Sequence, residues 1–225
     1  MKVSIIIPTY NERENIEELI KRIFKISKNL SLEVIVVDDN SQDGTAEIIK
    51  PLSKKYKVKF LKRPKKLGLT SAILDGLKLA KGNVIGVMDA DFSHPPEKIP
   101  ELIKATKDNG IVIGSRYIKN GKVKNRSIFR SAISWGATII AKLFFGLKIK
   151  DPLSGFFFCK RKILEKTSIN AVGFKILLNI LVKNRNKKIK EIPYISIERK
   201  KGKSKFDLQE IINYIRTVLV LRTSN

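Results

Sequence analysis

Hydrophobic positions in the first half of the chain form short continuous runs separated by longer amphipathic segments. Five such runs predict buried strands at residues 3–7, 34–37, 58–61, 84–88 and 111–113. Uninterrupted apolar runs of this length suit strands buried on both faces, and their alternation with helical segments is typical of parallel βαβ units. The chain is therefore expected to fold as an α/β protein, Rossmann-like, with a mostly parallel sheet and helices on both faces.

The positions between the strand runs predict the helices. Apolar residues from Ile16 to Phe24 recur at i, i+3, i+4, i+7 and i+8, which marks one buried helix face, and Asn11 is the expected N-cap. Further helices are predicted at about 44–55, 69–80 and 97–107. Pro95 and Pro96 would open the last of these, since proline suits a first helical turn.

The regular alternation stops after Gly114. Residues 115–127 are polar and basic and contain glycine, so they predict a mobile loop. Residues 128–147 predict an amphipathic helix in which apolar and aromatic side chains are interleaved with Arg130 and Lys142. That helix could belong to the core, or it could lie on a membrane surface with its basic residues toward the phospholipid. A final amphipathic helix at about 207–221 leaves the same two interpretations open.

Charge constrains the partners. The 225 residues include 46 Lys and Arg against 21 Asp and Glu, a formal net charge of +25, and residues 109–206 hold 24 of the basic but only four of the acidic side chains. A surface this basic favours an anionic partner, whether nucleic acid, an acidic membrane or a phosphorylated small molecule. The hydrophobic share of 43% is that of an ordinary globular protein and argues against disorder.

Cysteine content and the N-terminal pattern indicate a cytoplasmic protein. The single Cys159 excludes an intrachain disulfide and fits a small core residue in a reducing compartment. Residues 1–14 lack the apolar stretch and the small-residue site of a signal peptide. The longest uncharged stretch, 131–141, is shorter than the roughly 20 residues that cross a bilayer.

Carboxylates follow two of the predicted strands. Asp38 and Asp39 come after the second run, Asp89 and Asp91 come after the fourth, and these two strands are expected to be neighbours. Ligands of open parallel sheets bind beyond the carboxyl ends of the strands. Asp38 or Asp39 could equally cap the following helix. Asp89 and Asp91 suit a Mg²⁺ or Mn²⁺ ion lying between them and a bound anion, with structural capping as the alternative.

Several familiar site motifs are absent. The sequence has no Walker A motif and no glycine-rich fingerprint after the first strand, so a bound diphosphate would be held by a metal and basic side chains. Metalloprotease, zinc-module and serine-hydrolase motifs are missing too. The only histidine, His94, precedes Pro95 and is expected to support its neighbours rather than act as an acid or base.

Three segments resemble glycosyltransferase family 2, namely VSIIIPTYNE at 3–12, VVDDNSQDGT at 36–45 and DADFSHPPE at 89–97. This family implies the GT-A fold, a Rossmann-like sheet that binds a nucleotide sugar through a metal at a D-x-D motif. Four more segments, in this order, resemble its dolichyl-phosphate mannosyltransferases: IGSRY at 113–117, KDPLSGFFF at 150–158, VGFKILL at 172–178 and RKKGKSKF at 199–206. The resemblance covers essentially the whole chain.

The resemblance implies a donor site assembled from segments far apart in the sequence. The base and ribose would lie against Pro8, Tyr10, Glu12, Val37 and Asp39, and the diphosphate against Asp89, Ala90 and Asp91. Asp89 and Asp91 would hold Mg²⁺ or Mn²⁺, with Asp91 as the principal ligand. Ser93 stands where some relatives have Gln and would be a weak metal contact. Arg199 and Lys205 would close over the diphosphate, and Lys175 would line the same site.

The resemblance also implies an acceptor site. Arg116, Arg130 and Ser134 correspond to residues that receive the phosphate of a lipid acceptor, so the expected catalytic residues are Asp89, Asp91, Arg116 and Arg130. A lipid monophosphate is largely ionised at neutral pH and needs no strong base. A metal and basic side chains would stabilise the departing diphosphate. The implied reaction is inverting transfer of mannose from GDP-mannose to dolichyl phosphate.

Organisation and location follow from the same resemblance. Within one GT-A domain of residues 1–225, residues 1–114 would bind the nucleotide sugar, residues 115–205 would form the acceptor half with an interface helix, and residues 206–225 would form a C-terminal amphipathic helix. Because a polyprenyl acceptor stays in the bilayer, the protein is expected at the cytoplasmic face of a membrane, attracted to anionic lipid by its basic surface. Relatives either continue into transmembrane helices or depend on small membrane-spanning partner subunits.

Three other functions remain open at this level. A polyprenyl-phosphate glucosyltransferase that uses UDP-glucose would share most of these motifs. A basic nucleic-acid-binding protein would explain the charge, but few aromatic residues interleave the basic runs and the acidic pairs would repel a phosphate backbone, so no nucleic-acid partner is expected. A lectin-like or scaffold domain without catalytic activity is the third.

Overall fold

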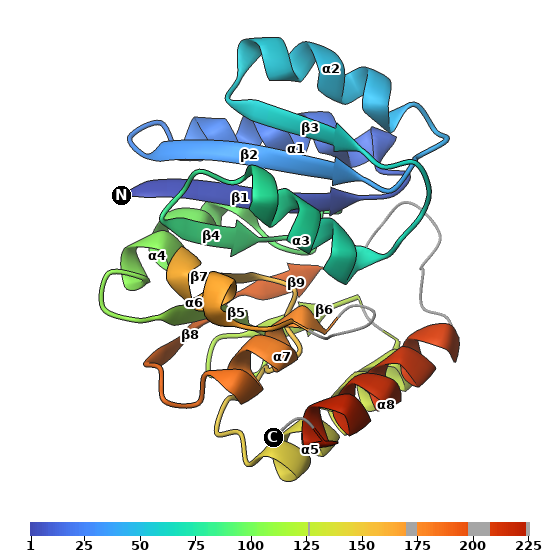
Figure 1. The fold of residues 1–225 in the computed structure, drawn as a ribbon, viewed down its shortest axis with the longest axis vertical. Helices are drawn as coiled ribbons and strands as arrows, with labels where there is room; N and C mark the ends of the chain where they lie inside the picture. Colours follow the sequence, from blue (N-terminus) through green and yellow to red (C-terminus); the bar gives the residue numbers. More distant parts are fainter. Residues whose placement is uncertain (126, 170–174, 198–207, 224–225) are drawn as a thin grey trace.

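A computed structural model describes residues 1–125, 127–169, 175–197 and 208–223 (Figure 1). The side chains at 129–130, 208–213 and 223 also lie outside the description. In the described part, seven strands form one sheet in the order β3-β2-β1-β4-β7-β5-β8, and a separate two-stranded sheet pairs β6 with β9. Strand β7 is antiparallel to both of its neighbours, and every other pair is parallel. The mostly parallel α/β sheet predicted from the sequence is confirmed.

All five predicted strands are present. They are β1 (Lys2–Thr9), β2 (Ser31–Asp38), β3 (Val58–Lys62), β4 (Val84–Val87) and β5 (Ile111–Ser115). The later strands are β6 (Lys122–Lys124), β7 (Phe157–Lys160), β8 (Ile189–Pro193) and β9 (Ile195–Ile197). The prediction of one continuous loop over 115–127 is wrong at its centre, because β6 pairs there with a strand some 70 residues away in the sequence.

The predicted helices are present, with shifted ends. They are α1 (Arg13–Ile26), α2 (Thr45–Lys55), α3 (Leu69–Leu79), α4 (Ile99–Ala105) after the 3₁₀ turn η1 (Pro96–Lys98), α5 (Ile128–Phe145) and α8 (Leu208–Thr223). Two further helices, α6 (Arg161–Lys166) and α7 (Ile176–Lys183), were not predicted. Asn11 does not cap α1. Glu12 holds the cap position, while Asn11 takes a left-handed φ of 54° and bonds to the neighbouring loop instead.

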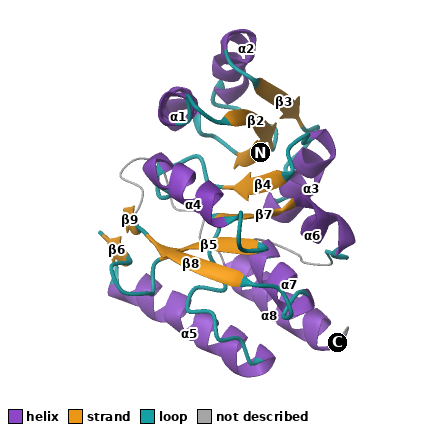
Figure 2. Cartoon of the chain, turned by 90° about the vertical axis from the view of Figure 1, so that its left-hand side faces the viewer, coloured by secondary structure: helices purple, strands orange, loops and turns teal. Residues whose placement is uncertain are grey.

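Helices cover both faces of the large sheet (Figure 2). Apolar residues of α1, α2 and α4 pack on one face, and apolar residues of α3, α6 and α7 pack on the other. Alternation along β1 divides the two cores, since Ile5 and Ile7 face the first and Ile6 faces the second. This arrangement leaves the carboxyl ends of the parallel strands uncovered by those core contacts, which is where ligands bind in open α/β sheets.

Helices α5 and α8 lie side by side at one end of the molecule, beyond β5 and β8 (Figures 1 and 2). Their inner faces form a third apolar cluster with α7, and the Tyr214 hydroxyl donates to the Ala137 carbonyl over 2.6 Å. Their outer faces expose large apolar side chains, including Trp135, Leu143 and Leu219. The core interpretation of α5 is confirmed for one face of the helix, and the membrane-surface interpretation stays a prediction for the exposed face.

Candidate functional site

The carboxyl ends of β1, β2 and β4 meet at one edge of the sheet. Asp38 ends β2 and Asp89 follows β4, but β1 lies between those two strands, so the expectation that they are neighbours is wrong. Two strand spacings amount to roughly 10 Å. A ligand that reached both carboxylate pairs would therefore extend across the end of β1.

Asp38 is a structural residue. Its buried carboxylate accepts hydrogen bonds from the Thr9 hydroxyl at 3.0 Å and from the Ser41 backbone N–H at 2.9 Å. It does not cap α2, because the N–H of Thr45 at the start of that helix bonds to Asp43. The capping alternative is therefore wrong for Asp38, which stabilises the turn after β2 instead.

Asp39 is tied to the loop between β3 and α3. One carboxylate oxygen lies 3.0 Å from the Arg63 guanidinium, and the other accepts the Gly68 N–H at 2.8 Å. The Arg63 side chain is only 2% exposed and also donates to the Gly68 carbonyl and the Ser71 hydroxyl. Lys66 in the same loop lies over the Tyr10 ring, 4.4 Å from its centroid. These contacts hold the loop after β3 against the loops after β1 and β2.

Hydrogen bonds also join the loop after β1 directly to the loop after β2. Asn11 donates its N–H to the Ser41 hydroxyl at 2.8 Å and accepts the Gln42 N–H at 3.0 Å, and Glu12 donates its N–H to the Thr45 hydroxyl. These bonds join the loops that carry Tyr10, Glu12 and Asp39, for which the family resemblance implies a base and ribose pocket. They join loops rather than regular elements, so periodicity could not reveal them.

Three further residues were predicted to bind the sugar donor, namely Pro8, Val37 and Ala90. Pro8 pairs with Val37 across β1 and β2. The Val37 side chain is fully buried in the core under α3, and the Ala90 side chain is buried in the core on the opposite face. Val37 and Ala90 can therefore offer a ligand only their main chains.

The D-x-D loop after β4 closes on itself through two hydrogen bonds. Phe92 takes a left-handed φ of 60°, which turns the Ser93 N–H back to Asp91 Oδ1 at 3.1 Å. His94 Nδ1 accepts the Asp89 N–H at 2.9 Å. The Asp89 side chain is 41% exposed, so its carboxylate projects from a loop whose backbone is fixed.

The His94 ring is enclosed by aromatic side chains. It stacks on Phe156 and meets the edge of Tyr194. Burial lowers the pKa of His94, and this effect outweighs the opposing effect of the Asp89 and Asp91 charges. A neutral imidazole agrees with the expectation that His94 supports its neighbours.

Arg116 follows β5 and forms a buried ion pair with Asp151. The Nε and Nη2 atoms each donate to the carboxylate at 2.8 Å, and the Arg116 backbone N–H adds a third bond at 2.9 Å. Asp151 is fully buried, and its own N–H is held by Glu191 on β8. Hydrogen bonding to Asp151 raises the pKa of Arg116 despite the opposing effect of burial. The guanidinium is therefore a permanently charged group with a fixed orientation.

The structure describes some, but not all, of the remaining residues predicted for the site. Ser134 lies on α5, and its hydroxyl is 3.1 Å from the Tyr117 hydroxyl, which links α5 to the segment after Arg116. Lys175 precedes α7, which leads through a short turn into β8 and so begins toward the carboxyl edge of the sheet. The Arg130 side chain and the residues Arg199 and Lys205 lie outside the described residues.

A family comparison agrees with this geometry. The model described as Glycosyl transferase family 2 matches residues 4–168, which include most of β1, all of β2 to β5 and the D-x-D loop. The chain belongs to glycosyltransferase family 2. The predicted family membership is confirmed.

Relatives within family 2 narrow the assignment to one branch. A dolichol-phosphate mannosyltransferase from Pyrococcus furiosus is 48% identical over 97% of this chain, which spans 63% of that protein's length. Proteins of the same name from Saccharomyces cerevisiae and Mycosarcoma maydis are 37% and 34% identical over 96% and 97% of this chain, and 85% and 78% of their own lengths are covered. The chain belongs to the dolichol-phosphate mannosyltransferase branch of family 2.

Solved structures show the same fold at lower identity. The glucosyl-3-phosphoglycerate synthase of Mycobacterium tuberculosis, in complex with Mn²⁺, UDP-glucose and phosphoglyceric acid, is similar with a TM-score of 0.72 and 19% identity over 99% of this chain and 79% of its own. Its complex with Mn²⁺, UDP and phosphoglyceric acid gives a TM-score of 0.73 at 20% identity, over 99% of this chain and 78% of its own. The GT-A fold predicted for this family 2 member is confirmed.

Sequence reasoning missed the residues that support this family 2 site. Arg63, Asp151 and Gly155 received no role, although each contacts a predicted site residue. One signal was available, because Asp151 and Glu191 are two of only four acids among the 24 basic residues of 109–206. An acid retained in so basic a segment indicates a specific cationic partner.

Proposed function

We propose that this protein transfers mannose with inversion from GDP-mannose to dolichyl phosphate, giving dolichyl β-D-mannosyl phosphate for protein glycosylation. The carrying observation is the closed D-x-D loop, which holds Asp89 and Asp91 at the carboxyl edge of a sheet in a family 2 chain. The relatives named above support mannose and dolichol phosphate as the sugar and the acceptor class.

Asp89 and Asp91 fit a divalent cation bound together with a diphosphate, either Mg²⁺ or Mn²⁺. Their oxygens are hard ligands, and within residues 1–125, 127–169, 175–197 and 208–223 no third His, Cys, Asp or Glu completes a metal cluster with them. Mg²⁺ commonly takes one or two carboxylates and fills its remaining positions with phosphate oxygens and water. When bound, such an ion supplies positive charge against the departing diphosphate. Ser93 contributes its N–H to Asp91 and stays a weak ligand in this proposal.

The nucleotide would lie between the loops after β1, β2 and β3. Tyr10 and Lys66 offer a ring and an ammonium group that are already in contact. Asp39 is held rigid by Arg63 and Gly68, so a base or ribose would meet a preformed surface. Lys175, Arg199 and Lys205 are the proposed cations around the diphosphate.

The acceptor phosphate would lie against Arg116, with Arg130 and Ser134 beside it. The bonds from the Arg116 side chain to Asp151 use two of its five N–H donors, and the guanidinium keeps its charge at any physiological pH. The anionic phosphate oxygen attacks the anomeric carbon, the bond from that carbon to the diphosphate breaks, and the configuration inverts. No proton has to leave the nucleophile, which fits a site without an available histidine base.

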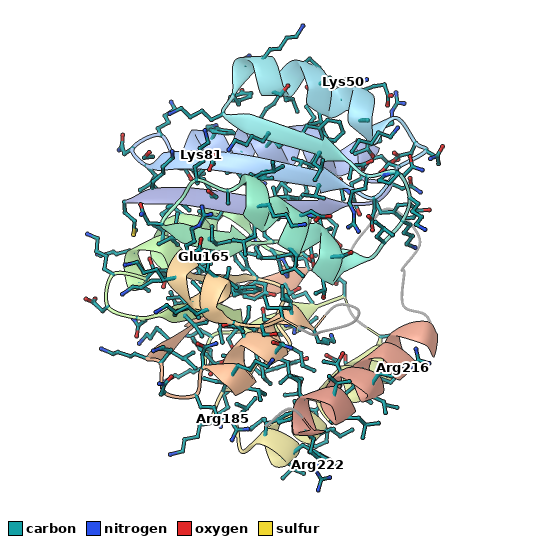
Figure 3. The ribbon with its side chains drawn as sticks, viewed as in Figure 1. Lys50, Lys81, Glu165, Arg185, Arg216 and Arg222 are labelled. Atoms are coloured by element: carbon teal, nitrogen blue, oxygen red, sulfur yellow. The ribbon has the colours of Figure 1, made fainter. Side chains whose placement is uncertain are left out.

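The outer faces of α5 and α8 are the proposed contact with an anionic membrane surface, at the cytoplasmic face. Trp135 and Leu143 on α5 are 64% and 77% exposed, and Leu219 on α8 is 55% exposed. Arg216 and Arg222 lie on α8 at the same end of the molecule (Figure 3). Apolar side chains flanked by basic ones are typical of helices that lie in a membrane interface.

None of the helices in the described part of the chain is long and apolar enough to cross a bilayer. Small membrane-spanning partner subunits are the alternative route to the lipid.

A donor competition assay tests the proposed reaction. Radiolabelled GDP-mannose and UDP-glucose are each offered with dolichyl phosphate and Mg²⁺ or Mn²⁺, and label is measured in the lipid fraction. We expect mannose incorporation only, and glucose-only incorporation would contradict the proposal. Asp91→Asn should reduce transfer by at least about a hundredfold, since it removes charge without changing shape. Asp108→Asn, an exposed site after α4, is the matched control and should retain full activity.

A further inference from the structure

The His94 ring is enclosed by three neighbouring residues. It is 4% exposed and stacks on Phe156 with centroids 5.0 Å apart and planes 8° apart, while the edge of Tyr194 closes a second side at 5.9 Å. Gly155 lies against a third side, where an added Cβ would come within 3.2 Å of His94 Cε1. That same Cβ would lie 3.5 Å from Asp89 Oδ2, so Gly155 lies against both residues. These contacts hold the plane of the ring.

This fixed ring is directed at the backbone of Asp89. The Asp89 N–H donates to Nδ1 over 2.9 Å. A backbone N–H can only donate, so Nδ1 carries no proton in this arrangement. The other ring nitrogen, Nε2, is 3.7 Å from Asp89 Oδ2, on the side of the carboxylate. Both nitrogens thus face Asp89, one toward its main chain and one toward its side chain.

The hydrogen bond to His94 fixes the main chain of Asp89 just beyond the end of β4, where the ladder pairs of the sheet no longer hold it. The last ladder pairs of β4 are those of Val87, with Ile6 on β1 and Phe157 on β7. Asp89 lies two residues further, and its side chain is 41% exposed. The His94 bond holds the main chain from which this carboxylate projects.

We propose that His94 is a positioning residue that sets the direction of the Asp89 carboxylate for the metal–diphosphate unit. The inference rests on the proposed function, because that function assigns Asp89 to the metal. Groups that orient a metal ligand typically change metal affinity by 10–100-fold when removed. Proton transfer is not the role of His94, since Nδ1 is occupied and the ring is enclosed. His94 therefore acts through Asp89 alone.

Two substitutions separate the hydrogen bond from the ring packing. His94→Phe keeps a stacked ring between Phe156 and Tyr194 but removes the acceptor. His94→Asn loses the ring but keeps an acceptor oxygen at the δ position. Binding of Mn²⁺ in the presence of GDP is measured by the electron paramagnetic resonance signal of free Mn²⁺. We expect His94→Phe to weaken Mn²⁺ binding about 10–100-fold and His94→Asn to recover most of that loss. The KM for dolichyl phosphate should stay within about twofold in both, because the acceptor site is not rearranged.

A remote control measures the effect of stability alone. Asn184→Ala removes buried hydrogen bonds to Thr167 and Ile180 near the start of β8, so it should lower the melting temperature and leave Mn²⁺ binding unchanged.

If His94→Phe does not fold, Phe156→Leu replaces it, because that variant loosens the ring while keeping Nδ1, and a partial loss of Mn²⁺ binding is expected. The positioning role would be overturned if His94→Phe, or Phe156→Leu used in its place, bound Mn²⁺ as tightly as the parent while the parent still transferred mannose. Absence of GDP-dependent Mn²⁺ binding in the parent would instead overturn the proposed function together with this inference.

Discussion

Asp151 makes three hydrogen bonds to one residue, Arg116, from a position with no solvent exposure. A buried charge pair is weak evidence for net stability, but removing one partner leaves the other charge buried and unpaired. Glu191 fixes the loop that carries Asp151 by accepting the N–H groups of Lys150 and Asp151. The direction of the Arg116 guanidinium is thus set by a fully buried carboxylate and by Glu191 behind it.

Replacing Asp151 should affect stability and acceptor binding together. We expect Asp151→Asn to lower the free energy of unfolding by about 3–5 kcal/mol, since the Arg116 charge stays buried without its counterion. The KM for dolichyl phosphate should rise roughly tenfold or more, with Mn²⁺–GDP binding unchanged, because only the acceptor arginine is misdirected. Urea denaturation and steady-state kinetics measure these quantities. Glu165→Gln, which breaks the exposed pair with Arg161, is the control and should cost less than about 1 kcal/mol. Equal losses of stability in the two variants would contradict this account.

At the scale of elements, the amino edge of the sheet is held by a network centred on Glu33 of β2. The Ser4 hydroxyl on β1 and the Lys81 N–H before β4 donate to one carboxylate oxygen, at 2.6 and 2.7 Å, and Lys59 on β3 lies 3.0 Å from the other. Four consecutive positions of the sheet order are thereby joined at the edge opposite the site. This network fixes the relative positions of the strands whose far ends carry the carboxylates.

The Glu33 network should give stability a pH dependence. Burial alone would raise the pKa of Glu33, but hydrogen bonds from Ser4, Lys81 and Lys59 outweigh it and lower the pKa below that of the unfolded chain. A lowered folded-state pKa gives a stabilisation that is complete above the unfolded value, about 4.3, and is lost as pH falls through the folded value. Glu33→Gln should therefore cost about 1–3 kcal/mol at pH about 7 and progressively less below pH about 4. Denaturant unfolding across that range measures the difference, with Glu101→Gln as an exposed control. A cost that does not change with pH would rule out this linkage.

At the scale of the whole molecule, the carboxylates proposed to bind the donor and the exposed apolar helix faces lie in different parts of the fold. The carboxylates occupy the carboxyl edge at β1, β2 and β4, while α5 and α8 lie beyond β5 and β8 (Figure 1). Arg116 follows β5, and Ser134 on α5 is linked to the segment after Arg116 through the Tyr117 hydroxyl, which lies 3.1 Å from the Ser134 hydroxyl.

Membrane association should depend on the outer face of α5. Leu143 is 77% exposed, and burying one leucine side chain is worth about 1.5–3 kcal/mol. Leu143→Glu should therefore weaken binding to vesicles containing anionic lipid by roughly tenfold or more, with GDP binding unchanged. Leu79→Glu, an exposed leucine at the end of α3, is the matched control and should bind as the parent does. Co-sedimentation with vesicles measures both, and equal binding by Leu143→Glu and the parent would remove α5 from the interface.

The hydrophobic pattern determined the elements of the first half of this protein. The five early strands, the helices between them and the D-x-D position follow from local periodicity, because each buried element must repeat apolar residues at its own period. The second half resisted the same reasoning. The three-residue strands β6 and β9, KVK and ISI, lack the continuous apolar run that marked β4 and β5. The family motifs located candidate residues there without revealing their partners.

Tertiary structure alone decided strand order and the partners of the site residues. It placed β1 between the two carboxylate pairs, inserted β7 antiparallel between β4 and β5, and gave Arg116, Asp39 and Asp89 their partners Asp151, Arg63 and His94. The physical reason is that periodicity records which face of an element is buried, whereas pairing depends on which distant segments packing brings within hydrogen-bond range. The sequence by itself determined which chemical groups this glycosyltransferase carries, and the fold decided how they are held and aimed.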